Sequence, residues 1–213
     1  MAFYILNPRS GAPPQSLVIL LHGYGANGQD LLSLGEAWAD QLRNTAFVAT
    51  DAPENCEGMP DGFEGYYQWF SLRDWSIDAM RAGARKVLPW LQQFLKEQSE
   101  THNVPMEKIA LVGFSQGTMM ALFYGLQASP HIAGVLGYSG ALLNEKLEMT
   151  ADIPLCLVHG DADDVVPVAA LHEAKTVLEK GGYKLETQVI PRLAHGIDPN
   201  GLQTGLTFLK TVL

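Results

Sequence analysis

A serine flanked by glycines stands out as a nucleophile, because the chain reads Gly113-Phe114-Ser115-Gln116-Gly117. This pentapeptide follows an apolar run of strand length, 109–114, and precedes a segment of helical pattern, 116–128. At a sharp strand-to-helix turn the serine takes a strained backbone conformation that lifts its hydroxyl above the sheet. Side chains in place of the two glycines would collide with the neighbouring strand and helix. The pentapeptide alone is common, but in this position it predicts that Ser115 attacks the carbonyl carbon of a carboxylic ester.

A serine hydroxyl needs a base to take its proton, and the six histidines supply the candidates. In a site of this kind the order along the chain is Ser, then Asp or Glu, then His. Only His172 and His195 come late enough for that order. His172 falls inside the helical pattern 167–178, whereas His195 lies in a loop between the last strand pattern and the last helical pattern. We therefore predict that His195 is the base.

Three aspartates compete for the acid in the loop that follows the apolar run 155–158. Asp163 has the loop position that best suits an acceptor for the second N–H of the histidine, and it would stabilise the imidazolium. Asp161 is nearer the end of the strand and is a candidate for holding the turn, while Asp164 is a candidate for capping the next helix. The alternative is that all three only make turns and caps, but the chain order favours Asp163.

Two further histidines, His22 and His159, each end an apolar run just before a glycine. No third and fourth ligand stands near either one at the spacing that a metal site needs. We interpret both as structural and predict no metal site.

A tetrahedral intermediate needs two hydrogen-bond donors for its oxygen, each worth about 3 kcal/mol in the height of the barrier. One donor is the backbone N–H of the residue after the nucleophile, Gln116. The other is expected in the loop 22–28, which contains three glycines and lets the backbone approach the substrate. We nominate the N–H of Tyr24; the alternative is an ordinary glycine-rich turn.

The segment 52–76 is the least regular part of the chain and is rich in proline, glycine and aromatic residues. A long loop inside a compact domain often carries function, and ligand pockets are lined mainly by apolar and aromatic side chains. We expect this segment to wall a substrate pocket, with Tyr66, Trp69 and Phe70 as candidate binding residues. The alternative is that these rings only pack the loop onto the body.

The elements that must position these residues alternate along the chain. Apolar runs of strand length cover 17–21, 46–49, 109–114, 132–136 and 155–158, an alternating run covers 185–190, and helical patterns cover 78–98, 116–128, 167–178 and 201–213. Continuous apolar runs are typical of strands buried on both faces of a mostly parallel sheet, and the alternating run favours an edge strand. The sequence thus predicts one α/β domain over residues 1–213, with its active site at the carboxyl ends of the strands.

Charge and composition limit the classes of partner that the protein can bind. The 213 residues carry 23 acidic and 14 basic side chains, a net charge of −9, which argues against a nucleic-acid partner because binding phosphates needs clustered Lys and Arg. No secretory pattern or apolar stretch of spanning length is present, and the two cysteines, Cys56 and Cys156, are too few for a disulfide framework. We expect a cytoplasmic protein that acts on a small-molecule or lipid-like ester; the sequence leaves a homodimer open.

Taken together, four segments in order resemble the phospholipase/carboxylesterase family, which includes small bacterial carboxylesterases and acyl-protein thioesterases. They are Leu20–Gly28, Gly113–Gly117, Gly160–Pro167 and Ala194–Gly196. The resemblance runs from about residue 16 to the end. It implies an α/β-hydrolase fold with helices on both faces of the sheet and a minimal lid, no cofactor, and a preference for short to medium acyl esters.

For the site, the same resemblance implies a triad of Ser115, Asp163 and His195, with oxyanion amides from Tyr24 and Gln116. Trp69 matches an aromatic of the family's substrate loop. The chain departs from the thioesterase branch after His22-Gly23, where that branch has Leu-Gly-Asp instead of Tyr-Gly-Ala, and at Asp164, where proline is common. The expected activity is therefore carboxylic ester hydrolysis. The alternatives are a lysophospholipase or acyl-protein thioesterase and, more remotely, a non-catalytic binding protein on the same fold.

Overall fold

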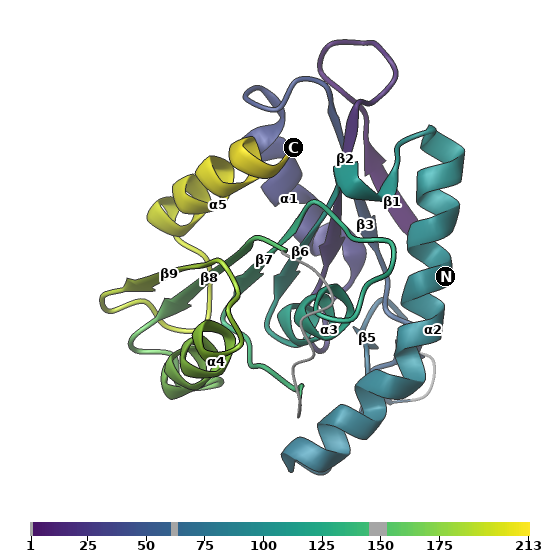
Figure 1. Cartoon of the computed structure of the whole chain (residues 1–213). Coiled ribbons are helices and arrows are strands. Elements are labelled where there is room, and N and C mark those ends of the chain that lie inside the picture. Colours follow the sequence, from purple (N-terminus) through teal and green to yellow (C-terminus); the bar gives the residue numbers. More distant parts are fainter. Residues whose placement is uncertain (1, 61–63, 145–152) are drawn as a thin grey trace.

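A mostly parallel sheet forms the centre of the molecule (Figure 1). The computed structural model describes residues 2–60, 64–144 and 153–213, and in these residues seven strands form one sheet in the order β1-β3-β2-β6-β7-β8-β9. The strands are β1 (Phe3–Leu6), β2 (Ser16–Leu21), β3 (Thr45–Thr50), β6 (Ile109–Phe114), β7 (Gly134–Tyr138), β8 (Leu155–Gly160) and β9 (Leu185–Ile190). Strand β1 pairs antiparallel with β3, and each of the other neighbouring pairs is parallel. A separate ribbon joins β4 (Glu54–Asn55) to β5 (Tyr67–Gln68).

Helices cover both faces of the sheet, as the sequence predicted. They are α1 (Gly28–Ala39), α2 (Ile77–His102), α3 (Gln116–Gly125), α4 (Ala169–Lys180) and α5 (Pro199–Val212), with a 3-10 turn, η1 (Met106–Lys108). One apolar core lies between the sheet and α2, α3 and α4, and a second lies between the sheet and α1 and α5. Figure 1 shows α5 beside α1 on one side of the sheet and α3 and α4 on the other.

The continuous apolar runs become strands that are buried along their whole length. In β2, Leu17 and Ile19 face one core while Val18 and Leu20 face the other. A strand between two helical layers has no solvent face, so its apolar residues need not alternate with polar ones. Strand β9 lies at the edge of the sheet and is only partly buried, which confirms the interpretation of its alternating pattern.

Strand β1 and helix α1 are among the elements that were not predicted from the sequence. Strand β1 is only four residues long, is partly exposed and lies at the edge of the sheet. Helix α1 begins at a capping box in which the Asn27 side chain accepts from the Asp30 N–H and the Asp30 carboxylate accepts from the Asn27 N–H. The strand expected at 132–136 also begins later, at Gly134.

The strand order reverses beside β2, because the chain passes from β2 outward to β3 and then returns to β6 on the other side of β2. Ligands of open α/β sheets bind in the crevice at such a reversal, beyond the carboxyl ends of the strands. No helix in the described residues is both long and apolar enough to cross a membrane.

Candidate active site

Ser115 sits between β6 and α3 in a backbone conformation that side chains rarely adopt. Its φ is 54° and its ψ is −116°, and its N–H donates to the Tyr138 carbonyl at 2.9 Å, which ties the turn to β7. A Cβ atom on Gly113 would come within 2.4 Å of the Gly117 backbone, and one on Gly117 would come within 1.9 Å of the Leu21 oxygen. The two glycines therefore let the helix pack against the strands closely enough to hold the strained serine.

The structure brings His195 and Asp163 together from the loops after β9 and β8. His195 Nδ1 lies 2.8 Å from Asp163 Oδ2. The other carboxylate oxygen, Oδ1, accepts from the amides of Val165 and Val166 at 3.0 and 2.8 Å. Burial acts to raise the pKa of Asp163, but the hydrogen bonds from His195 and from the two amides outweigh it and hold the pKa below its ordinary value. The acid is thus kept ionised beside the histidine.

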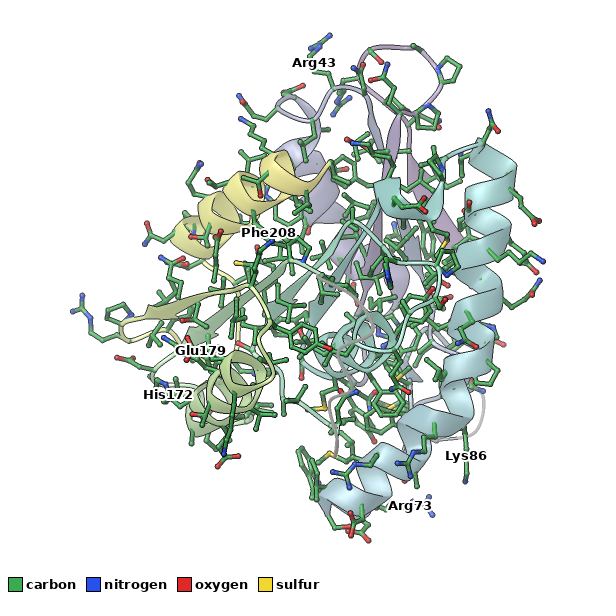
Figure 2. The ribbon with its side chains drawn as sticks, viewed as in Figure 1. Arg43, Arg73, Lys86, His172, Glu179 and Phe208 are labelled. Atoms are coloured by element: carbon green, nitrogen blue, oxygen red, sulfur yellow. The ribbon has the colours of Figure 1, made fainter. Side chains whose placement is uncertain are left out.

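The competing residues lie elsewhere. Asp161 accepts from the Arg192 N–H and holds the turn between two loops, as its position suggested. The capping role considered for Asp164 is not found, because α4 begins after Val168 and has no side-chain cap. His172 is exposed on α4 (Figure 2) and is not among the residues that line the cavity of Ser115 described below.

Ser115 and His195 line one cavity of about 430 Å³, and both nominated oxyanion residues, Tyr24 and Gln116, line it with them. Gln116 is the first residue of α3, where backbone amides have no acceptor within the helix. Among the described residues neither the Tyr24 nor the Gln116 N–H donates to an acceptor. Two free amides thus come from residues that line the same cavity as the serine, which is the arrangement that an oxyanion requires.

His22 sets the direction of one of these amides. Its Nε2 accepts from the Ala52 N–H at 2.9 Å, so the ring hydrogen is on Nδ1 and is donated to the Gly23 carbonyl at 2.7 Å. Burial lowers the pKa of His22, which keeps the ring neutral. The Gly23 carbonyl and the Tyr24 N–H belong to one trans peptide and point in opposite directions. By holding the carbonyl, His22 therefore aims the amide.

The wall of the cavity is apolar. It is lined by Gly23, Tyr24, Leu72, Trp75, Phe114, Ser115, Gln116, Met119, Val165, Val166 and His195. The segment 52–76 contributes through Leu72 and Trp75, whereas Tyr66, Trp69 and Phe70, which were expected to bind substrate, are not among the lining residues. Tyr66 is exposed, and Trp69 and Phe70 are buried. Phe63, which lies in the same segment, is outside the described residues.

Trp69 and Phe70 instead anchor the segment to the nucleophile turn. The Gln116 side chain accepts from the Trp69 N–H and donates to the Phe70 carbonyl, both at 2.8 Å. The Trp69 ring also donates to the His22 carbonyl at 2.8 Å. These rings therefore fix the loop that presents Leu72 and Trp75 to the cavity. Among the described residues, no group of three or more His, Cys, Asp or Glu side chains could hold a metal ion.

Comparisons with known proteins show which family and which solved structures the chain resembles. A family model described as Phospholipase/Carboxylesterase matches residues 4–213. The chain is 26% identical to esterase YpfH of Escherichia coli over 199 residues, which are 93% of this chain and 83% of that protein. It is 29% identical to acyl-protein thioesterase 1 of Neurospora crassa over 195 residues, which cover 84% and 79% of the two chains. Among solved structures, that of esterase PE8 is 38% identical with a TM-score of 0.90, and covers 99% of this chain and 98% of its own.

Proposed function

The chain belongs to the phospholipase/carboxylesterase family of serine hydrolases, and from this premise we propose that it hydrolyses carboxylic esters with short to medium acyl chains. The observation that carries the proposal is that Ser115, in a strained turn, and His195, which is paired with the buried Asp163, line one apolar cavity. The sequence motifs and the geometry support the same residues in the same roles.

In the proposed reaction the Ser115 Oγ attacks the ester carbonyl as His195 Nε2 takes the hydroxyl proton. The carbonyl oxygen becomes an oxyanion that accepts from the Tyr24 and Gln116 amides. When the C–O bond to the alcohol breaks, His195 donates the proton to the leaving oxygen. Water then attacks the acyl-enzyme with His195 again as the base, which releases the acid and restores Ser115.

The cavity also indicates the kind of acyl group. Apart from His195, none of the lining residues that the structure describes carries an acid or base that ionises near neutral pH. A charged acyl group would lose its hydration there without gaining a partner, whereas an alkyl chain gains about 25 cal/mol for each Å² buried. The proposal is therefore limited to uncharged acyl groups.

A fluorophosphonate probe tests the proposal, because it forms a covalent adduct only with an activated serine. We expect one adduct on Ser115 by mass spectrometry and turnover of p-nitrophenyl butyrate. The Ser115→Ala variant should lose the adduct and at least about 10³-fold in kcat, since the nucleophile is gone. Full activity in that variant would refute the assignment, and a wild-type protein without an adduct would favour a binding protein on this fold.

A thioesterase or lysophospholipase is the second candidate, because several relatives are acyl-protein thioesterases and the cavity mouth exposes Trp75 and Val165. An acyl-enzyme forms in the same way from esters and thioesters. Matched p-nitrophenyl esters and acyl-thiocholines of 2 to 16 carbons separate the candidates. A peak of kcat/KM at about 4 to 8 carbons supports the esterase, and a continued rise toward the longest chains supports the second candidate.

A further inference from the structure

A second histidine lies against the proposed catalytic acid. His159 is at the end of β8, only 1% exposed, and its Nε2 lies 2.7 Å from the Val166 carbonyl oxygen and 3.3 Å from Asp163 Oδ2. A carbonyl and an ionised carboxylate can only accept hydrogen bonds. The Nε2 atom must therefore carry a hydrogen, which points between the two oxygens. The hydrogen bond to the carboxylate is the weaker of the two, because 3.3 Å is longer than an ordinary N–H···O bond.

Asp163 Oδ2 is thus shared by two histidines that come from different strands. His195 Nδ1 approaches it at 2.8 Å from the loop after β9, and His159 approaches it from β8. The Asp163 carboxylate is completely buried. In such surroundings a hydrogen bond from a neutral donor affects the carboxylate more strongly than it would in water.

We propose that His159 is a positioning residue for this reaction: it orients the Asp163 carboxylate and shares the negative charge with which Asp163 stabilises the His195 imidazolium. The proposal rests on the proposed function, because it assigns a role through the same acid and base. It goes beyond the triad by adding a fourth side chain, buried behind the acid, that touches no substrate.

Few other ionisable groups face this cluster. Helix α4 packs on the side of β8 that bears His159 and buries Leu171, Ala174 and Leu178 there. After β7 the neighbouring residue is the buried Ser139, whose N–H donates to the Val158 carbonyl. Asp161 and Asp164, in the loop of Asp163, are exposed. Among the residues that the structure describes, His195 is therefore the group whose protonated form His159 can make more or less stable.

The direction of the effect follows from charge sharing. While His159 donates to Oδ2, part of the carboxylate's negative charge is taken up by that hydrogen bond. Without this donor the whole charge acts on the His195 imidazolium and stabilises it further. His195 then keeps its proton to a higher pH, and because only the neutral ring can accept the Ser115 proton, the acidic limb of the kcat/KM profile moves to higher pH.

The experiment compares three variants with the wild type. His159→Leu removes the donor at similar volume, His159→Gln restores a side-chain N–H, and His172→Leu is the control, since His172 is an exposed histidine on α4 (Figure 2). Each protein is titrated with a fluorophosphonate to count active sites, its Tm is recorded, and kcat and KM for p-nitrophenyl butyrate are measured from pH 5 to 9. If the wild type takes no label, the proposed function itself is wrong. That outcome is thus distinct from a failure of this inference.

We expect His159→Leu to lower kcat per labelled site about 10-fold with KM nearly unchanged, because the Asp163 carboxylate loses a hydrogen bond that orients it toward His195. Its acidic limb should move up by about half a pH unit or more. His159→Gln should recover most of the lost kcat and most of the shift of the acidic limb, and His172→Leu should match the wild type.

If His159→Leu lowers Tm or the labelled fraction while kcat per site and the acidic limb stay in place, His159 is only structural and the proposal is overturned. A limb that moves to lower pH would overturn it equally. If His159→Leu does not fold, His159→Gln decides the question by comparison with the wild type. A wild-type kcat per site and a wild-type acidic limb support the proposal, whereas a lowered kcat per site with a wild-type limb overturns it.

Discussion

At the scale of single residues, hydrogen bonds separate three aspartates that the sequence places within four positions. Asp163 receives two backbone amides on one oxygen and a histidine on the other. Asp161 receives the Arg192 amide, and Asp164 is exposed and caps no helix. Two amides restrain the carboxylate beside the histidine, which is what an acid that orients a base requires.

The pair Asp163→Asn and Asp161→Asn tests this distinction with the same chemical change. We expect Asp163→Asn to lower kcat by about 10³- to 10⁴-fold, because an amide neither stabilises the imidazolium nor fixes the tautomer of His195. Asp161→Asn should keep kcat within about threefold of the wild type, since an amide oxygen can still accept from Arg192. Steady-state kinetics on active-site-titrated protein give the answer. Similar losses in the two variants would mean that the acid has been misassigned.

At the scale of elements, the turn that holds Ser115 is hydrogen-bonded to the segment 52–76. The Gln116 side chain bridges to the backbone of Trp69 and Phe70, and the segment then continues to the cavity residues Leu72 and Trp75. Gln116 thus has two separate parts in the site, because its amide faces the cavity while its side chain holds the segment that forms one wall.

Replacing the Gln116 side chain should therefore disturb substrate binding more than chemistry. In Gln116→Ala the backbone N–H remains, while the Trp69 N–H and the Phe70 carbonyl lose their buried partners, at a cost of about 1–3 kcal/mol in the free energy of unfolding. We expect KM for p-nitrophenyl esters to rise about 5- to 10-fold and kcat to change less. Gln93→Ala, on the exposed face of α2, is the matched control. A fall in kcat at constant KM would contradict the proposed division.

The parts that were predictable from the sequence depend on local pattern. The strand-to-helix turn at Ser115 and the loops of Asp163 and His195 each follow a strand that the sequence pattern predicts, so the parallel sheet and the chain order place them. The partners of Gln116 and His22 could not be predicted, because Trp69 and Ala52 are 47 and 30 positions away and no periodic pattern links them. For the same reason the aromatic residues that line the cavity could not be told apart from those that anchor the loop.

At the scale of the whole molecule, a fall in pH affects the free energy of unfolding in two opposite ways, one through surface charge and one through a buried histidine. The net charge of −9 becomes smaller as the pH falls toward the isoelectric point near 5.0, which weakens repulsion in the folded chain. The buried His22 has a lowered pKa, so below its ordinary value near 6.5 the unfolded chain binds a proton that the folded chain does not. The lowered pKa of Asp163 matters only in more acidic solution, below about pH 4.

His22 should therefore make the protein less stable as the pH falls from 7 to 5, by up to about 1.4 kcal/mol for each pH unit below 6.5. Urea unfolding of the wild type, His22→Leu and His172→Leu at several pH values measures this slope. We expect the wild type and the exposed-histidine control to share it, and His22→Leu, although less stable overall, to lack it. The same slope in all three proteins would show that another group takes up the proton.

The close approach of Gly117 to β2 has a consequence for motion in the site. A methyl group has no room between Gly117 and the carbonyl oxygens of Leu21 and His22, so α3 and the end of β2 are in direct backbone contact. Gln116 precedes this contact by one residue, and Tyr24 follows it by two. The spacing of the two amides is therefore set by backbone against backbone, without a side chain that could change rotamer between them. A change in the shape of the cavity wall at Trp75 would thus leave the spacing of the two amides unchanged.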